Sequence, residues 1–297
     1  MTLSETFEAV SPSVVAFVSR LRITSAGQKP VFPRIFGTGF IVDQDGVVAT
    51  NAHVIQAFDH IPRNPKTGES GLAAIFFLRG REYKSWQMLL VDVKGWWALE
   101  SFTSSGNWYG RSVPDIGFVQ LGVREVPFLK VATEDFDVRV GMAIATVGYP
   151  MGDLPLTAFG KVNQTTPFLR QGIVSSVFPF PTAQPHGFTV DIMQQGGSSG
   201  SPIFPVGGQS VVGMMASSVL DWNMVQSDQL TLAVAQNTNI SIAEPAPTIA
   251  LALDAFRREH PPDLGGVPTL EEMRAKWPEG STEDTLSWDS WRSTDTA

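Results

Sequence analysis

The chain contains 297 residues, of which 43% are hydrophobic and 17% are charged, so it can form a substantial core and global disorder is not expected. Its formal net charge of −8 argues against a nucleic-acid-binding surface. No segment approaches the roughly 18 consecutive apolar residues of a transmembrane helix, so we expect no membrane span.

The N-terminus and the cysteine count bear on the compartment. Residues 1–8 are acidic and lack a basic region followed by an apolar run, so we expect no Sec-type signal peptide. The chain has no cysteine, which excludes disulfides and thiolate metal sites. A cytoplasmic protein without metal or cofactor is therefore expected.

The first predicted elements are a short helix and a strand. Residues 4–10 favour a helix, with Ser4 as its N-cap and Glu5 in its first turn. Pro12 should end this helix, and the apolar residues 14–18 then predict a strand.

Two β-rich stretches follow along the chain. Short apolar runs separated by Gly, Pro, Asp and Asn begin near residue 36, and a second such stretch covers about residues 156–243. Asp45-Gly46 between two apolar runs is a strong hairpin signal. Regularly spaced short strands of this kind are typical of all-β barrels or sandwiches.

The C-terminal part changes character after Pro245. Residues 248–258 predict an amphipathic helix, and residues 259–297 form an acidic, proline-bearing tail that we expect to be loosely ordered. The tail carries three tryptophans, which indicate that it docks on a surface. They are Trp277, Trp288 and Trp291.

Three short segments carry the residue types needed for nucleophilic catalysis. His53 follows a β-rich run and a Thr-Asn-Ala turn, Asp115 precedes an apolar run, and Ser199 lies between glycines in residues 197–202. A serine hydroxyl is a weak nucleophile until a base takes its proton, and the base needs a third group to fix its tautomer. The order histidine, aspartate, serine is that of chymotrypsin-type peptidases.

Each of these roles has rivals elsewhere in the chain. His60 is expected to be solvated, His260 to end the last helix, and His186 to be a loop residue near the substrate pocket. Asp115 is preferred over Asp92 because a carboxylate that enters an apolar strand needs a partner.

Five blocks of sequence occur in a recognisable order. They are residues 37–55, 115–121, 140–152, 171–175 and 191–202. Together they resemble the trypsin-like serine peptidases of the bacterial HtrA/Deg type over about residues 8–257. The resemblance implies an all-β fold of two six-stranded antiparallel β-barrels of the chymotrypsin type, with short N-terminal and C-terminal helices. It places the first barrel at about residues 21–150 and the second at about 156–243.

The resemblance also implies a role for each candidate residue. Ser199 would be the nucleophile, His53 the general base and then acid, and Asp115 the group that orients His53. The backbone N–H groups of Gly197 and Ser199 would form the oxyanion hole. Because the apolar Met193 would lie at the base of the S1 pocket, we expect cleavage after small or medium apolar residues. The full set of expected substrate-binding residues is Met193, Gln195, Ala216, Ser217 and Ser218.

Three features depart from the family pattern. The residues after the last predicted helix are too few for a PDZ domain. Ser198 stands where zymogen-activated trypsins carry an aspartate, so activation by N-terminal cleavage is not implied. Residues 94–111 are expected to be an inserted loop, whereas Asp191 is expected to organise the turn before Ser199.

The sequence therefore predicts a serine endopeptidase that acts on protein or peptide substrates and binds neither nucleic acid nor membrane. Two alternatives stay open: a protease effector activated by a regulatory protein partner, and a catalytically silent, peptide-binding pseudo-protease. The insertion at residues 94–111 and the tail are the segments expected to restrain activity. For the tail, simple coverage of the second barrel is the alternative.

Overall fold

The structure is a computed structural model of the chain. The residues that it describes are 1–19, 35–61, 70–79, 86–104, 106–133, 137–150, 156–158, 162–164, 166–182, 184–227 and 230–275. Trp277, Trp288, Trp291 and the Met151-Gly152 pair lie outside these residues.

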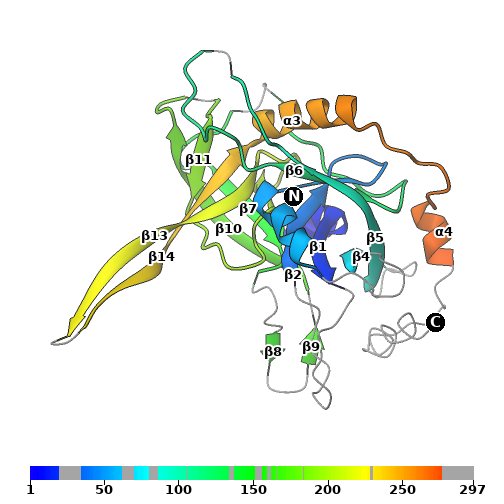
Figure 1. The fold of residues 1–297 in the computed structure, drawn as a ribbon, viewed down its shortest axis with the longest axis horizontal. Helices are drawn as coiled ribbons and strands as arrows, with labels where there is room; N and C mark the ends of the chain where they lie inside the picture. Colours follow the sequence, from blue (N-terminus) through cyan, green and yellow to red (C-terminus); the bar gives the residue numbers. More distant parts are fainter. Residues whose placement is uncertain are drawn as a thin grey trace.

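Two closed antiparallel barrels of six strands each form the body of the molecule, which confirms the predicted fold class (Figure 1). The first barrel has the order β1 (Val14–Ser19), β2 (Ile35–Ile41), β3 (Val47–Thr50), β6 (Gly117–Leu121), β5 (Trp86–Ala98) and β4 (Leu72–Arg79). The second has the order β10 (Phe168–Phe178), β11 (Gly187–Val190), β14 (Leu230–Pro245), β13 (Gly213–Ser227), β12 (Pro202–Pro205) and β7 (Ala143–Gly148). A separate pair consists of β8 (Leu156–Ala158) and β9 (Val162–Gln164).

The division of strands between the barrels differs from the predicted boundaries. The first barrel begins with β1 at Val14, upstream of the predicted start at residue 21. β7, predicted to lie in the first barrel, pairs with β10 and β12 and so belongs to the second. Strand pairing decides membership of a barrel, and an apolar run in the sequence does not reveal its partner.

Among the described residues, four α-helices and two short 3-10 helices accompany the barrels. They are α1 (Leu3–Val10), η1 (Ser11–Ser13), α2 (Ala52–Gln56), η2 (Ala57–His60), α3 (Ala246–Glu259) and α4 (Leu270–Ala275). The cap of α1 is Thr2 rather than Ser4, because the Thr2 hydroxyl accepts the Glu5 N–H and the Glu5 carboxylate accepts the Thr2 N–H. Among the described residues, no helix has the length and apolar character that a membrane span requires.

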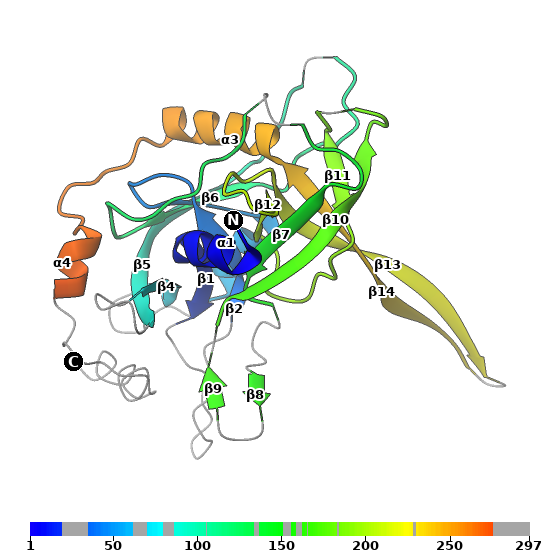
Figure 2. The ribbon, with the colours of Figure 1, turned by 180° about the vertical axis from the view of Figure 1, so that it is seen from behind.

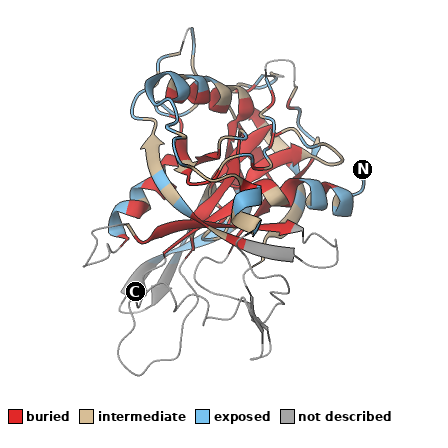
Figure 3. Ribbon diagram, turned by 90° about the vertical axis from the view of Figure 1, so that its right-hand side faces the viewer, coloured by how far each residue is buried: buried red, intermediate tan, exposed pale blue. Residues whose placement is uncertain are grey.

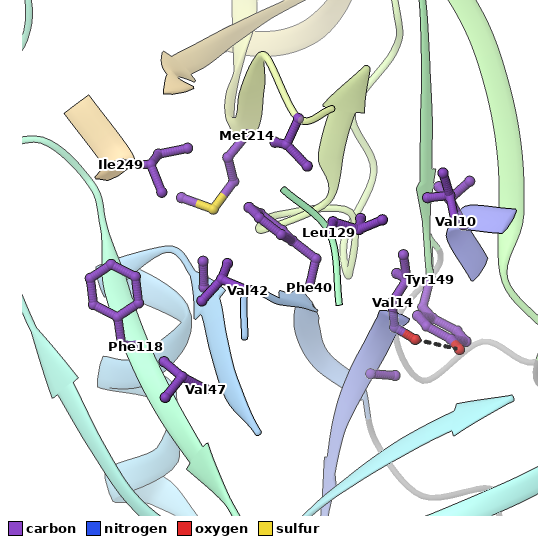
Figure 4. Packing of buried hydrophobic residues seen from close by; sticks show 14 of the residues in the cluster. Val10, Val14, Phe40, Val42, Val47, Phe118, Leu129, Tyr149, Met214 and Ile249 are labelled. Carbon is purple, nitrogen blue, oxygen red and sulfur yellow. Dashed lines mark hydrogen bonds between the residues drawn. The ribbon is translucent and has the colours of Figure 1, made fainter. Parts of the chain in front are cut away.

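A shared core joins the two barrels (Figure 4). It combines Phe40 and Phe118 of the first barrel with Met214 of the second and Ile249 of α3, and all four side chains are fully buried. Burial of one such side chain stabilises the fold by roughly 1.5–3 kcal/mol. Figure 3 shows that buried residues concentrate in the barrel strands, so the barrels are fixed against each other by their packing.

The predicted insertion at residues 94–111 is shorter than expected. Residues 94–98 complete β5 and continue its pairing with β6. Trp96 meets Phe58 edge-on with ring centroids 5.8 Å apart, and Trp97 stacks on Phe118 at 6.1 Å. Both indoles are therefore anchored to the first barrel, and the loop proper covers residues 99–114.

The described start of the tail packs on the first barrel. The Arg124 N–H donates to the Pro268 carbonyl at 3.1 Å, and the Leu270 N–H donates to the Arg124 carbonyl at 2.9 Å. The Leu270 side chain is buried in the core of the first barrel. The tail thus begins on the first barrel, whereas the sequence suggests the second as the surface to be covered.

β13 and β14 extend beyond the second barrel as a two-stranded arm (Figures 1 and 2). The arm's ladder begins with Leu220 opposite Asn237 and continues to Ser227 opposite Leu230. A register shift between Ser218 and Leu220 separates the arm from the part of β13 that closes the barrel.

Candidate active site

A cleft of about 610 Å³ is lined by residues of both barrels. His53 reaches it from α2, Asp115 from the segment before β6, and Ser199 from the turn before β12. The structure thus brings together the three catalytic candidates, which lie up to 146 residues apart in sequence (199 − 53).

His53 and Asp115 form a close pair. The two atoms His53 Nδ1 and Asp115 Oδ2 are 2.6 Å apart, and the backbone N–H of His53 donates to Asp115 Oδ1 at 3.0 Å. Asn51 Nδ2 donates to the Asp115 carbonyl at 2.8 Å. A carboxylate at this position accepts a hydrogen bond from Nδ1–H. This tautomer leaves Nε2 without a proton, so Nε2 is the basic nitrogen of the imidazole. Asp115 is buried, while the His53 side chain is 46% exposed and so remains accessible from the cleft.

Arg111 and Glu244 complete the charges around Asp115. Arg111 Nη1 lies 3.4 Å from Asp115 Oδ2, the same oxygen that faces His53, and its Nε lies 3.7 Å from Glu244 Oε1. Glu244 Oε1 also accepts the Asp115 N–H at 3.1 Å. Arg111 Nη2 donates to Ser217 Oγ at 2.7 Å, so the 99–114 loop of the first barrel contacts β13 of the second.

The two buried carboxyl groups differ in their pKa. Burial opposes ionisation of Asp115, but hydrogen bonds from His53 and the charges of His53 and Arg111 outweigh it, so the pKa of Asp115 is lowered. For Glu244 burial dominates, and its pKa is raised despite the hydrogen bond from the Asp115 N–H and the nearby Arg111.

The nucleophile turn is fixed to the first barrel by Thr38 of β2. The Thr38 hydroxyl donates to the Gly197 carbonyl at 2.7 Å and accepts the Tyr149 N–H at 2.9 Å. The Thr38 N–H donates to the Ser199 carbonyl at 2.8 Å. Gly200 has a φ of +85°, and a side chain there would collide with the Thr38 carbonyl, so glycine is required at this close approach.

Gly197 and Ser199, the predicted oxyanion-hole donors, lie in the turn before β12. Gly197 has a φ of +90°, a conformation that a residue with a side chain rarely adopts. Within the part of the chain that the structure describes, neither the Gly197 N–H nor the Ser199 N–H has a protein acceptor. Both groups can therefore donate to a ligand.

Gln194 is a residue of this site that the sequence analysis misses. Its Nε2 donates to Ser199 Oγ at 2.8 Å and lies 3.3 Å from the Ala216 carbonyl. Its Oε1 is buried and accepts no hydrogen bond from any described residue. No hydrogen bond joins Ser199 to His53 among the described residues, so the only described side chain bonded to the nucleophile is Gln194.

The expected substrate-binding residues separate into two groups. Gln195, Ala216, Ser217 and Ser218 line the cleft, whereas Met193 lines a much smaller cavity and is 38% exposed. The structure thus places Gln194, and not Met193, on the cleft wall beside Ser199.

The rival residues lie away from the cleft lining. His186 stacks on Trp108 with ring centroids 4.5 Å apart and accepts the Tyr109 N–H at Nδ1. His260 is the C-cap of α3, and His60 is exposed at the end of η2. Asp92 lies in β5 opposite Ala73, and Asp191 Oδ1 accepts the Ile173 N–H at 2.5 Å. That last contact gives Asp191 a structural position next to β10.

The residues that sequence reasoning misses give weak local signals. Glu244 is a lone carboxylate between the buried Ala243 and a proline, and an acid in such a position calls for a partner. Arg111 lies in a polar loop with nothing in the sequence to distinguish it from a solvated residue. Gln194 stands next to Gln195, and the sequence does not show which of the two turns toward Ser199.

This chain resembles known proteins both in sequence and in fold. The sequence profile of the family described as the trypsin-like peptidase domain matches residues 37–214. A protein of Halomonas elongata named as a probable periplasmic serine endoprotease, DegP-like, is 26% identical over 181 residues, which are 60% of this chain and 28% of that protein. This chain therefore spans less than a third of that relative. Its name places the relative in the periplasm, and the cytoplasmic location expected for this chain stays a prediction.

Solved structures support the fold. The HtrA-type protease AlgW with a decapeptide superposes with a TM-score of 0.51 at 15% identity, covering 88% of this chain and 68% of that one. A serine endoprotease from Yersinia pestis gives a TM-score of 0.50 at 13% identity, with 87% and 68% covered. At these identities the likeness shows the two-barrel fold alone.

The role of the Thr38 hydroxyl can be tested by Thr38→Val, which removes the hydroxyl and keeps the shape. The Gly197 carbonyl and the Tyr149 N–H then lose a partner, so the free energy of unfolding should fall by about 1–3 kcal/mol. Chemical denaturation measures this change. Thr38→Ser keeps the hydroxyl and should remain close to wild type, whereas equal stability of the valine variant and wild type would contradict the assignment.

Glu244 should make stability depend on pH in a defined direction. Because burial raises the pKa of Glu244 above its ordinary value of 4.5, its stabilising contribution is complete below pH 4.5 and is lost as the pH rises through the folded-state pKa. Glu244→Gln keeps an acceptor for the Asp115 N–H and cannot ionise. The melting temperature of the variant should therefore rise relative to that of wild type as the pH rises from 4.5.

Thermal unfolding at a series of pH values measures this difference. The exposed Glu100→Gln is the matched control for the loss of one carboxylate. A difference between Glu244→Gln and wild type that stays constant with pH would show that Glu244 carries no such linkage.

Proposed function

We propose that this chain, which belongs to the trypsin-like peptidase domain family, is a serine endopeptidase with Ser199 as nucleophile, His53 as general base and Asp115 as the group that orients His53. The observation that carries the proposal is the 2.6 Å contact between His53 Nδ1 and Asp115 Oδ2 at the edge of a cleft that also exposes Ser199. The family supplies the chemistry, and this geometry supports the assignment of roles.

The proposed reaction is acyl transfer through a covalent intermediate. Ser199 Oγ attacks the peptide carbonyl while His53 Nε2 takes its proton, and the ionised Asp115 stabilises the resulting imidazolium. The carbonyl oxygen gains negative charge and is stabilised by the N–H groups of Gly197 and Ser199. His53 then protonates the leaving amine, and a water molecule deacylates Ser199 by the same steps in reverse.

The lowered pKa of Asp115 supports this mechanism because the orienting group has to remain ionised. The N–H groups of Gly197 and Ser199 find no acceptor among the described residues, which supports their assignment as donors to the oxyanion. No metal or cofactor enters any of these steps.

We further propose that the residue before the cleaved bond is small or medium and apolar. Gln194 occupies the cleft wall next to Ser199 and shortens the space available to that side chain. The cleft wall from Gln194 to Gly196 and from Ala216 to Ser218 has no carboxylate, so a lysine or arginine would be buried there without a counter-ion.

A protease effector activated by a partner is the second candidate. The observation in its favour is the hydrogen bond from Gln194 to Ser199 Oγ, together with the lack of one from Ser199 to His53 among the described residues. In such an enzyme the partner would displace Gln194 and let Ser199 turn to His53.

Labelling with a fluorophosphonate tests the nucleophile. We expect the reagent to attach to Ser199 in wild type and not to react with Ser199→Ala, because only an activated serine hydroxyl attacks phosphorus. His53→Ala should lose nearly as much peptidase activity as the double variant with Ser199→Ala, because the members of a triad act as a unit. Mass spectrometry of the labelled peptide identifies the site, and a label on any other serine refutes the assignment.

Gln194→Ala tests the pocket and the resting contact together. A peptide-library profile of wild type should be dominated by cleavage after small or medium apolar residues, and the variant should shift toward larger apolar ones. Fluorophosphonate labelling of the variant should be faster if Gln194 restrains Ser199. Gln171→Ala, an exposed change on β10, is the matched control. Cleavage mainly after arginine or lysine would mean that an acidic group outside this wall reaches the pocket.

A further inference from the structure

The β13–β14 arm has one strongly apolar face. Leu220, Trp222 and Met224 alternate along β13, so their side chains project to the same side of the ribbon. Their exposed fractions are 46%, 62% and 66%, far above those expected for large apolar side chains that have a partner.

The cross-strand partners on that face are small. Trp222 lies opposite Ala235 and Met224 lies opposite Ala233. The alanine side chains of β14 are too small to cover the large side chains of β13. The other face is mixed: it carries Asp221 and Asn223, Asn223 Nδ2 donates to Gln236 Oε1 at 3.0 Å, and Val234 lies opposite Asn223 with 40% of its surface exposed. The arm is therefore a two-stranded ribbon whose largest exposed apolar side chains gather on one face, and it projects from the body of the molecule (Figure 2).

One edge of the arm starts inside the candidate active site. Ala216, Ser217 and Ser218 of β13 line the cleft, and the same strand continues without interruption into the arm. β12 pairs with β13 at Gly213 and Met214, and backbone hydrogen bonds with Ser201 and Gly200 continue this pairing to Met215. From Ala216 onward, the described ladders leave this edge of β13 unpaired. An open edge of this kind is a template for one more strand.

We propose that the arm binds the segment of an extended polypeptide substrate that flanks the cleaved bond. The segment would add a strand to the free edge of β13 and place apolar side chains, at alternate positions, against Leu220, Trp222 and Met224. This proposal rests on the proposed function, because the occupant enters the arm from the cleft.

The charge of the arm fits such an occupant. Residues 219–240 contain no lysine or arginine and only two aspartates, so the arm lacks the basic side chains that anionic membranes and nucleic acids require. Residues 219–224 extend about 20 Å beyond the cleft, since a strand rises about 3.3 Å per residue. The preferred flank is therefore about six residues long, uncharged, and apolar at every second position.

Three fluorogenic peptides test the proposal. They share one core that fills the cleft, and two of them carry an additional flank of about six residues, alternating leucine and threonine, at the N-terminal or the C-terminal end. With wild-type protein, kcat/KM for one flanked peptide should exceed that for the core peptide by about tenfold or more, because several apolar cross-strand contacts act together. The same flank with proline at alternate positions should lose this gain, because proline cannot donate to a ladder.

A matched pair of variants assigns the gain to the apolar face. The combined variant Leu220→Thr, Trp222→Thr and Met224→Thr should lose the gain and still cleave the core peptide at the wild-type rate. The combined control Asp221→Thr, Asn223→Thr and Gln236→Thr changes polar residues of the opposite face and should keep the gain.

Three results would overturn the proposal. No gain with either flank, or an equal gain in the apolar-face variant, would show that the arm does not bind substrate. A wild-type dimer that the apolar-face variant breaks, in sedimentation velocity, would make this face an interface between copies of the chain.

Failure of the proposed function gives a different result. Folded wild-type protein would then leave even the core peptide uncleaved. In that case the fluorescence anisotropy of labelled core and flanked peptides on Ser199→Ala still decides the matter: tighter binding of a flanked peptide, lost in the apolar-face variant, supports the arm, and equal binding refutes it.

Discussion

Two groups of Thr38, its hydroxyl and its backbone N–H, hold the second barrel's nucleophile turn against the first barrel. The side chain is fully buried, so its hydroxyl and backbone need partners, and they find them at Gly197, Ser199, Tyr149 and Thr50. The shared core sets the distance between the barrels, but apolar packing is non-directional. The directional contacts of one threonine therefore determine where the Ser199 turn lies relative to His53 and Asp115, which the first barrel provides.

The charges around Asp115 show how the site reconciles burial with ionisation. A buried carboxylate needs compensation, and Asp115 receives it from His53 on one side and Arg111 on the other. Arg111 shares Oδ2 with His53, so it secures the ionised aspartate and at the same time draws part of that oxygen's charge away from the imidazole. Burial raises the pKa of Glu244, so the two carboxyl groups that face Arg111 are shifted in opposite directions.

Sequence reasoning recovers those features whose cause is local. The glycines around Ser199, the turn before His53 and the apolar run after Asp115 each require a particular backbone or partner, so each is visible in a short segment. The features that it misses depend on contacts between distant parts of the chain. Glu244 accepts the N–H of Asp115, which lies 129 residues away in sequence, and β7 belongs to the second barrel because it pairs with β10. The sequence does not reveal the end of β5 for the same reason. Trp96 and Trp97 are anchored by their contacts with Phe58 and Phe118, and those ring contacts are seen only in the folded chain.

The arm and the nucleophile are connected through a single side chain at the arm's base. Asn237, opposite Leu220, donates its Nδ2 to the Gln194 carbonyl at 2.8 Å, and the Gln194 side chain donates to Ser199 Oγ. Asn237 is itself fixed by the Asn239 N–H, at an irregular point of β14 where Asn239 has a φ of +63°. A strand added along β13 would lie against the base of the arm, and that base holds Gln194 by its backbone carbonyl. Substrate binding on the arm would therefore act on Gln194, the same residue that has to leave Ser199 before the nucleophile can turn to His53.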